Sequence, residues 1–252
     1  MEPEKPSEAK PAREGINRRQ LFAGVGGAAL GFAAGWYLHH IPGGMDGVEP
    51  MPGNAHEALD RLKEGNERFS AGRVVRHHQS RAWRHRLTGE QRPYATVLGC
   101  SDSRVPVELV FDQGFGDLFV VRVAGNVATD PEIASIEYAA DHLHTPLVVV
   151  MGHQSCGAVG AAIAGGTPEG HLPTLVNVIQ PAVDEARKEK GDLSANAVRI
   201  NVERTVQQLR ESKPVIAELV AEHKVRVVGA VYSLDTGRVQ WLPETSATAE
   251  QK

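Results

Sequence analysis

The chain has 252 residues, with 27 Lys and Arg against 31 Asp and Glu and a formal net charge of −4. This mildly acidic balance argues against a nucleic-acid-binding protein, whose surface is usually basic. Hydrophobic residues at 41% and charged residues at 23% exclude a chain that is disordered throughout. The two cysteines, Cys100 and Cys156, are too few for a disulfide-dense scaffold. They could form one disulfide, stay as buried thiols or contribute to a metal site.

The N-terminal segment has the pattern of an export signal. Residues 1–15 carry almost no large apolar side chains, and we expect them to be disordered. Arg18 and Arg19 then precede an uncharged run, rich in Gly and Ala, that continues to Leu38. This order resembles a twin-arginine export signal over residues 1–38. The resemblance implies the export machinery as a partner and a periplasmic or otherwise exported protein.

A membrane anchor is an alternative for the same uncharged run. Residues 18–38 approach the roughly 20 apolar residues needed to cross a bilayer, and the positive flank before them suits a cytoplasmic N-terminus. No small-x-small cleavage site is clear after Leu38, so retention of the run as an anchor stays open. Residues 39–53 are rich in Gly and Pro and are predicted to form a linker.

From Asn54 to about Leu242, predicted strands alternate with predicted helices. The predicted strands are Tyr94–Gly99, Asp117–Ala124, Leu147–Gly152, Val225–Tyr232 and a short hairpin partner at Val239–Leu242. The predicted helices are Ala55–Ser70, an exposed helix or arm at Arg73–Arg86, Glu132–His142, Cys156–Ala164, Pro173–Lys190, Ser194–Arg210 and Pro214–His223. This alternation predicts an α/β fold with a mainly parallel central sheet flanked by helices, and a short antiparallel edge strand at its C-terminal end. Residues 54–242 are predicted to be one domain and residues 243–252 a flexible tail.

Side chains suited to a metal follow two of the predicted strands. Cys100 ends the first strand, with Asp102 close behind it, and His153 and Cys156 follow the third strand. Functional groups in parallel sheets gather beyond the carboxyl ends of the strands, so these side chains meet if the two strands are neighbours. Two sulfurs, one nitrogen and one oxygen fit a tetrahedral zinc ion. A disulfide and two inert buried thiols stay open as alternatives.

Asp102 has a second candidate partner in Arg104. An arginine within about 4–6 Å lowers the pKa of an Asp by roughly 1–3 units and favours a bidentate pair. If Asp102 leaves the metal for Arg104, a fourth metal position opens, as in catalytic rather than structural zinc sites. The alternative is an ordinary surface salt bridge that contributes little to stability.

Three motifs in this order closely resemble the β-class carbonic anhydrases. They are Cys100–Arg104, Asp117–Asn126 and Gly152–Gly157, and the resemblance extends from Gly65 to Gly237. It implies one Zn²⁺ per chain with three fixed ligands, the family's Asp–Arg dyad, and carbon dioxide or bicarbonate as substrate. The implied ligands are Cys100, His153 and Cys156, with Asp102 as a fourth ligand in closed forms, and the implied dyad is Asp102 and Arg104.

The resemblance also implies a substrate pocket. Four residues match its positions: Gln91, Phe119, Tyr138 and Gly157. Each of the two aromatic side chains could equally belong to the core. The family's pocket lies across a dimer interface, which implies a homodimer or a higher even oligomer. Some members have a second, inhibitory bicarbonate site, which Arg122 and Tyr232 match. Val97 stands where that site has a Trp, so we expect the site to be weak or absent here.

The implied reaction is the reversible hydration of carbon dioxide to bicarbonate and a proton by a zinc-bound hydroxide. Zinc lowers the pKa of its water from 15.7 to about 7. Two thiolate ligands should raise that value relative to a three-histidine site, so activity should increase toward alkaline pH. The alternatives are a zinc hydrolase of carbon disulfide or carbonyl sulfide, a non-catalytic zinc-binding module, and an exported redox protein with a Cys100–Cys156 disulfide.

Overall fold

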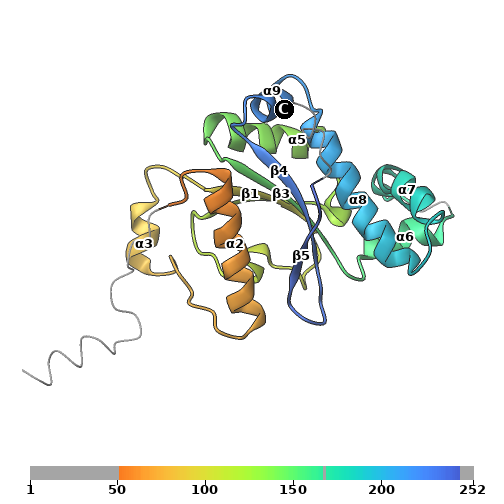
Figure 1. The fold of residues 1–252 in the computed structure, drawn as a ribbon, viewed down its shortest axis with the longest axis horizontal. Coiled ribbons are helices and arrows are strands. Elements are labelled where there is room, and N and C mark those ends of the chain that lie inside the picture. Colours follow the sequence, from red (N-terminus) through yellow and green to blue (C-terminus); the bar gives the residue numbers. More distant parts are fainter. Residues whose placement is uncertain (1–50, 167–168, 245–252) are drawn as a thin grey trace, which may run out of the picture. The chain divides into compact units, whose positions relative to one another are not determined.

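The computed structural model describes residues 51–166 and 169–244 (Figure 1). The predicted export signal, most of the predicted linker and most of the predicted tail therefore lie outside the described residues. Within the described part of the chain, no helix combines the length and the hydropathy needed to cross a bilayer. All described helices and strands belong to one compact unit.

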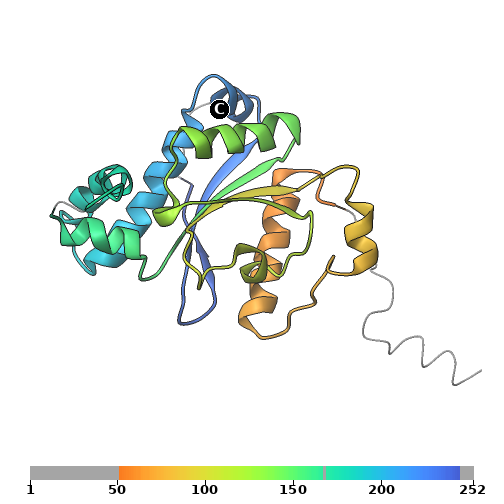
Figure 2. The same ribbon diagram turned by 180° about the vertical axis from the view of Figure 1, so that it is seen from behind.

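A five-stranded sheet forms the centre of this unit (Figures 1 and 2). Its strands are β1 (Ala95–Gly99), β2 (Leu118–Arg122), β3 (Leu147–His153), β4 (Arg226–Tyr232) and β5 (Val239–Trp241). They are ordered β2-β1-β3-β4-β5; the first four are parallel, and β5 pairs antiparallel with β4. The predicted fold class, with its short antiparallel edge strand, is confirmed.

Helices cover both faces of the sheet (Figures 1 and 2). They are α2 (Ala55–Ser70), α3 (Arg81–Arg86), α4 (Val107–Val110), α5 (Asp130–Glu137), α6 (Gly157–Ala164), α7 (Pro173–Ala186), α8 (Leu193–Arg210) and α9 (Val215–Ala221). Successive strand residues point to opposite faces. Val97 and Val149 therefore pack with α2 and α4, whereas Leu98 and Val150 pack with α5, α8 and α9. Both β1 and β3 are buried along their whole length, as strands covered on both faces must be.

Apart from shifts of one or two residues at helix ends, the helices differ from the prediction at four places. Of the exposed helix or arm predicted at Arg73–Arg86, only Arg81–Arg86 is helical. α4 was not predicted, because a single turn shows no apolar periodicity. The helix predicted to start at Glu132 starts at Asp130, because Thr129 and Glu132 form a capping box, and it continues after α5 as a π-helical turn, η2 (Tyr138–His142). α7 ends at Ala186, and the exposed charged residues after it lead to a turn at Gly191, which has a positive φ.

One buried side chain on α2 ties the helix to two distant segments. Asn66 is 5% exposed, and its amide donates to the carbonyl oxygens of Val110 at 3.0 Å and Gly237 at 2.9 Å. Its oxygen accepts from the Val239 N–H at 2.8 Å. The preceding Gly65 allows this approach, because a Cβ there would lie 1.9 Å from a backbone oxygen of the loop after α4. Asn66 thus fixes both α4 and the β4–β5 hairpin.

Replacing Asn66 with Ala should lower the free energy of unfolding by about 2–4 kcal/mol, because two carbonyl groups and one N–H lose a buried partner. Urea unfolding at fixed protein concentration measures this loss. The matched control is Asn196→Ala, which removes one hydrogen bond at the surface and should cost less than about 1 kcal/mol. Small and equal losses in the two variants would contradict the role given to Asn66.

Candidate metal centre

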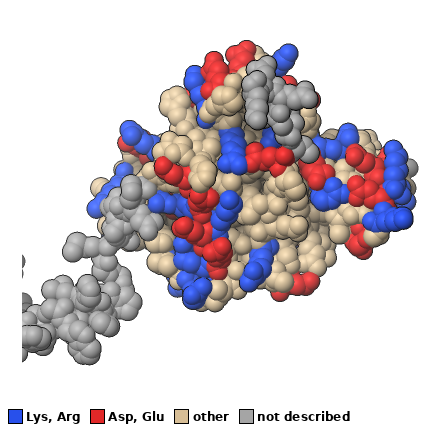
Figure 3. Space-filling view, in the orientation of Figure 1, with Lys and Arg blue, Asp and Glu red and all other residues tan. Residues whose placement is uncertain are grey.

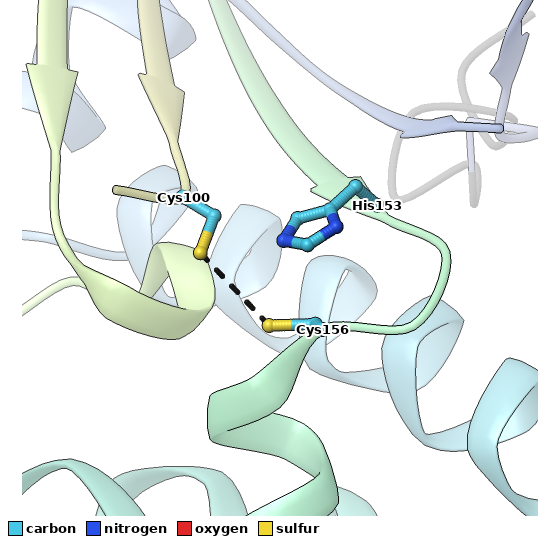
Figure 4. Close-up of side chains that lie close together, drawn as sticks. All are labelled: Cys100, His153 and Cys156. Atoms are coloured by element: carbon cyan, nitrogen blue, oxygen red, sulfur yellow. Dashed lines mark hydrogen bonds between the residues drawn. The ribbon is translucent and has the colours of Figure 1, made fainter. Parts of the chain in front are cut away.

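The two predicted metal-binding motifs meet because β1 and β3 are adjacent parallel strands. Gly99 of β1 is in register with Met151 of β3, so Cys100 and His153 lie at the same edge of the sheet. Cys156 follows in the next loop and stands at the N-cap position of α6, without a side-chain capping hydrogen bond. Figure 4 shows the three side chains pointing toward one another.

The geometry of this cluster suits a zinc ion. The three candidate ligand atoms lie within 4.8 Å of one another, and all three residues are buried. The sulfurs of Cys100 and Cys156 are 3.9 Å apart, whereas disulfide sulfurs are about 2.05 Å apart. Tetrahedral zinc with Zn–S bonds of about 2.3 Å places two sulfurs about 3.8 Å apart. Among the described residues, the buried Nε2 of His153 has no hydrogen-bond partner, as a ligand atom requires.

Neighbouring groups prepare each ligand atom. Nδ1 of His153 lies 2.9 Å from the Gln154 carbonyl oxygen, so Nδ1 carries the proton and Nε2 presents its lone pair to the cluster. The backbone N–H of Gly125 donates to the Cys100 sulfur at 3.3 Å. Cys156 occupies the N-cap of α6, where free backbone N–H groups favour a thiolate.

The two sulfurs also set each other's protonation. A hydrogen bond from the Cys156 thiol lowers the pKa of Cys100 and outweighs the opposing effect of burial, and the backbone N–H of Gly125 lowers this pKa further. The same contact raises the pKa of Cys156, and burial adds to that increase. A second negative charge so close to the first needs a cation beside it, and a coordinated metal ion deprotonates a thiol outright. The donor set therefore fits a soft divalent metal such as zinc better than magnesium or calcium.

Asp102 and Arg104 form a pair beside the cluster. Arg104 donates from Nε to Oδ1 at 2.9 Å and from Nη2 to Oδ2 at 2.7 Å, which is a bidentate geometry. These hydrogen bonds hold the pKa of Asp102 below its ordinary range. Oδ2 of Asp102 also lies 3.8 Å from Nε2 of His153. The carboxylate thus borders the metal-binding atoms while Arg104 holds it.

Backbone carbonyl groups support the pair in a way that sequence reasoning missed. Nη2 of Arg104 donates to the Ser155 carbonyl oxygen at 3.2 Å. Arg122, at the end of β2, donates to the carbonyl oxygens of Cys100 at 2.9 Å and Asp102 at 2.7 Å. Arg122 is the residue that matches the family's second bicarbonate site. Its guanidinium here is hydrogen-bonded to the loop that carries Cys100 and Asp102. Backbone acceptors have no residue-type signature, and the only available signal was the position of Arg122 at a strand end.

The four predicted pocket residues are brought together only in part. The rings of Phe119 and Tyr138 lie 6.2 Å apart, and Tyr138 is 45% exposed. Gly157 is the first residue of α6, and the space beside its Cα is open. Gln91 is exposed. In the described part of the chain, no hydrogen bond or ring contact links Gln91, Phe119 or Tyr138 to the metal-binding cluster.

Comparison with known proteins gives the family. The sequence model of the carbonic anhydrase family matches residues 95–239. Carbonic anhydrase 2 of Mycobacterium tuberculosis is 43% identical over 189 residues, which cover 73% of this chain and 91% of that protein. A carbonic anhydrase of Mycolicibacterium smegmatis is 41% identical over 191 residues, which cover 74% of this chain and 93% of that protein.

Solved structures share the fold. The β-carbonic anhydrase of Coccomyxa, in complex with acetazolamide, aligns with a TM-score of 0.60 and 27% identity, covering 73% of this chain and 86% of that one. A β-carbonic anhydrase of Sordaria macrospora, one of two described as tetrameric, aligns with a TM-score of 0.59 and 28% identity, covering 74% and 95% of the chains. These matches confirm the predicted activity, carbon dioxide hydration, and the predicted zinc cofactor. The chain belongs to the carbonic anhydrase family, in its β class.

Proposed function

We propose that the chain hydrates carbon dioxide with Cys100, His153 and Cys156 as zinc ligands and with Asp102 and Arg104 as the catalytic pair. One observation carries this assignment. The buried Nε2 of His153 lies next to two thiols and has no hydrogen-bond partner among the described residues. A buried polar atom without a partner destabilises the fold unless a ligand occupies it. The two sulfurs favour zinc as that ligand.

Asp102 has the position and the charge to orient the attacking group. Zinc held by Cys100, His153 and Cys156 would supply a nucleophile near neutral pH, because zinc lowers the pKa of its water from 15.7 to about 7. The ionised Asp102 accepts a hydrogen bond from the attacking hydroxyl and so directs an oxygen lone pair at carbon dioxide. Arg104 keeps the carboxylate ionised and fixed in place, and the Ser155 carbonyl group holds Arg104 in turn.

A second copy of the chain would complete the substrate pocket. β2 is an edge strand whose residues are mostly half-buried, and exposed Tyr138 lies next to Phe119 of that strand. Exposed edges with apolar side chains are normally covered, and the same edge of a second copy could cover this one by two-fold symmetry. Sedimentation equilibrium tests this homodimer, and a fully active monomer would contradict it.

Export of the protein is the third part of the proposal. Arg18 and Arg19 before the uncharged run to Leu38 support a twin-arginine signal, and retention of residues 18–38 would leave the enzyme anchored. Proteins with such signals are exported already folded, which would allow zinc loading while both thiols are reduced. Fractionation of cells tests this, and activity confined to the cytoplasm would contradict it.

Stopped-flow measurement of carbon dioxide hydration by the zinc-loaded protein tests the activity. We expect faster turnover at pH 8.5 than at pH 7, because two thiolates place more negative charge on zinc than three histidines do and so raise the pKa of water. Equal turnover at both pH values would contradict the argument from ligand charge. Bound zinc without turnover at either pH would contradict the activity and favour carbon disulfide or carbonyl sulfide as substrate.

The variant Cys156→Ser should lose more than about 100-fold in zinc affinity. Removing a residue that only hydrogen-bonds to a metal ligand already lowers metal affinity by about 10–100-fold, and this variant removes a ligand itself. The melting temperature should fall with the zinc content, since metal-binding energy is folding energy. Atomic absorption and calorimetry measure the two effects. Ser101→Ala, an exposed neighbour of Cys100, is the control and should keep its zinc. Full zinc occupancy in Cys156→Ser would remove Cys156 from the ligand set.

The variant Asp102→Ala should keep its zinc, because three ligands remain, but kcat should fall by at least about 100-fold. Stopped-flow kinetics on protein of known zinc content separates the two effects. Glu108→Gln, which neutralises an exposed carboxylate on α4, should be as active as the wild type. Wild-type turnover in Asp102→Ala would show that the pair with Arg104 is only structural.

A further inference from the structure

An arm between α2 and β1 contributes none of the groups described above. Residues 73–86 contain five arginines and no Asp or Glu, although the whole chain is acidic. All five arginines are exposed, and only α3 within the arm is helical. We use the name basic face for these arginines together with their exposed apolar neighbours: Arg73, Arg76, Arg81, Arg84, Arg86, Val74, Val75 and Phe115.

The arm is packed firmly against the body of the protein. The buried His78 contacts Asp117 through Nδ1 and Oδ1 at 2.6 Å, and Asp117 is 1% exposed. Trp83 of α3 stacks on the His78 ring at 3.8 Å, and its indole N–H donates to the Phe115 carbonyl oxygen at 2.8 Å. The arginines therefore project from a fixed support, which reduces the ordering cost of binding a partner.

The positive charge of the basic face is not neutralised within the described residues. None of its five arginines forms an ion pair with a described residue, and the nearby carboxylates are committed elsewhere. Asp112 accepts from Arg68 at 2.6 Å, and Glu90 pairs with Arg92 at 3.0 Å. Figure 3 shows part of this charge as blue atoms over α3, at the left edge of the molecule.

Apolar side chains are exposed among these arginines. Val75 is 56% exposed, Phe115 49% and Val74 40%. The guanidinium of Arg84 lies 5.9 Å from the Phe115 ring centroid, and the Val75 N–H donates to the Asp112 carboxylate at 3.1 Å. The first contact places the Phe115 ring beside an arginine of the basic face, and the second fixes the backbone of Val75, which stands between Arg73 and Arg76 in the chain.

We propose that the basic face docks on an anionic lipid bilayer. Arginine side chains bind the phosphate of lipid headgroups, and exposed apolar side chains enter the boundary between headgroups and acyl chains. A nucleic acid would also engage the arginines, but its backbone gives the two valines no apolar environment. The fixed combination of unpaired arginines with exposed Val74 and Val75 therefore favours a bilayer.

Co-sedimentation of the full-length, zinc-loaded protein with vesicles tests the docking. One set of vesicles is phosphatidylcholine with about one third phosphatidylglycerol, and the other is phosphatidylcholine alone, both at about 0.15 M ionic strength. The ratio of the two partition coefficients removes the contribution of any segment that inserts regardless of lipid charge. We expect the wild type to prefer the anionic vesicles and to lose that preference at about 1 M salt, where the Debye length is about 3 Å.

Two variants separate the parts of the basic face. Arg73→Glu/Arg76→Glu/Arg81→Glu should lower partition onto the anionic vesicles by roughly 100-fold, at about fivefold per arginine. Val74→Ser/Val75→Ser keeps every charge and should lower partition onto the anionic vesicles several-fold. The matched control is Lys188→Glu/Lys190→Glu/Arg204→Glu, which changes the net charge equally at exposed positions near α7 and α8 and should stay within about twofold of the wild type. All variants should retain carbon dioxide hydration.

Three results would overturn the proposal. The first is equal partition of the wild type onto both kinds of vesicle. The second is an equal loss in the arginine variant and in the control, which would reduce the effect to net charge. The third is binding to a single-stranded oligonucleotide that depends on the arginines, with no effect of the serine substitutions on vesicle binding, which would identify a nucleic acid as the partner.

Discussion

The parallel pairing of β1 with β3 is the constraint on which the metal centre depends. The register of Gly99 with Met151 places Cys100 and His153 at one edge of the sheet. A slip by one residue would turn each side chain of β1 to the other face and separate the thiol from its partners. The pairing brings two sulfurs to 3.9 Å and leaves a histidine nitrogen unpartnered among the described residues, an arrangement that zinc stabilises. Folding and zinc binding in this carbonic anhydrase are therefore linked.

Support for the proposed catalytic pair of Asp102 and Arg104 comes mainly from the backbone. Arg104 holds Asp102, the Ser155 carbonyl group holds Arg104, and Arg122 at the end of β2 holds the loop from Cys100 to Asp102. Three adjacent strands thus contribute to the position of one carboxylate. Rigid supports of this kind matter because a catalytic group must stay within a fraction of an ångström of its productive position.

Two neighbouring surfaces have different physical character. The edge strand β2 has half-buried apolar residues over 118–121, and its one exposed residue, Arg122, donates to the metal-binding loop, so this edge suits self-association about a two-fold axis. The basic face carries like charges that would repel one another across such an axis, so it suits an anionic partner instead. His78 and Asp117 join the two surfaces, because they fix the arm to the start of β2.

The sequence by itself determined the strand and helix alternation, the candidate metal-binding side chains and the family. These features depend on residue type and spacing, as in Cys100, His153 and Cys156, and so they can be read from a linear pattern. The short α4 could not be predicted, because a single helical turn shows no hydrophobic periodicity. The end of α7 could not be predicted, because a run of charged residues is compatible with a further helical turn or with a loop. Only the tertiary structure decided that Arg104 holds Asp102, that Arg122 donates hydrogen bonds to the loop from Cys100 to Asp102, and that the arginines of the arm are exposed together with Val74 and Val75. Those outcomes depend on hydrogen bonds to backbone carbonyl groups and on packing between segments far apart in the chain. Neither can be predicted from the residue type at a single position.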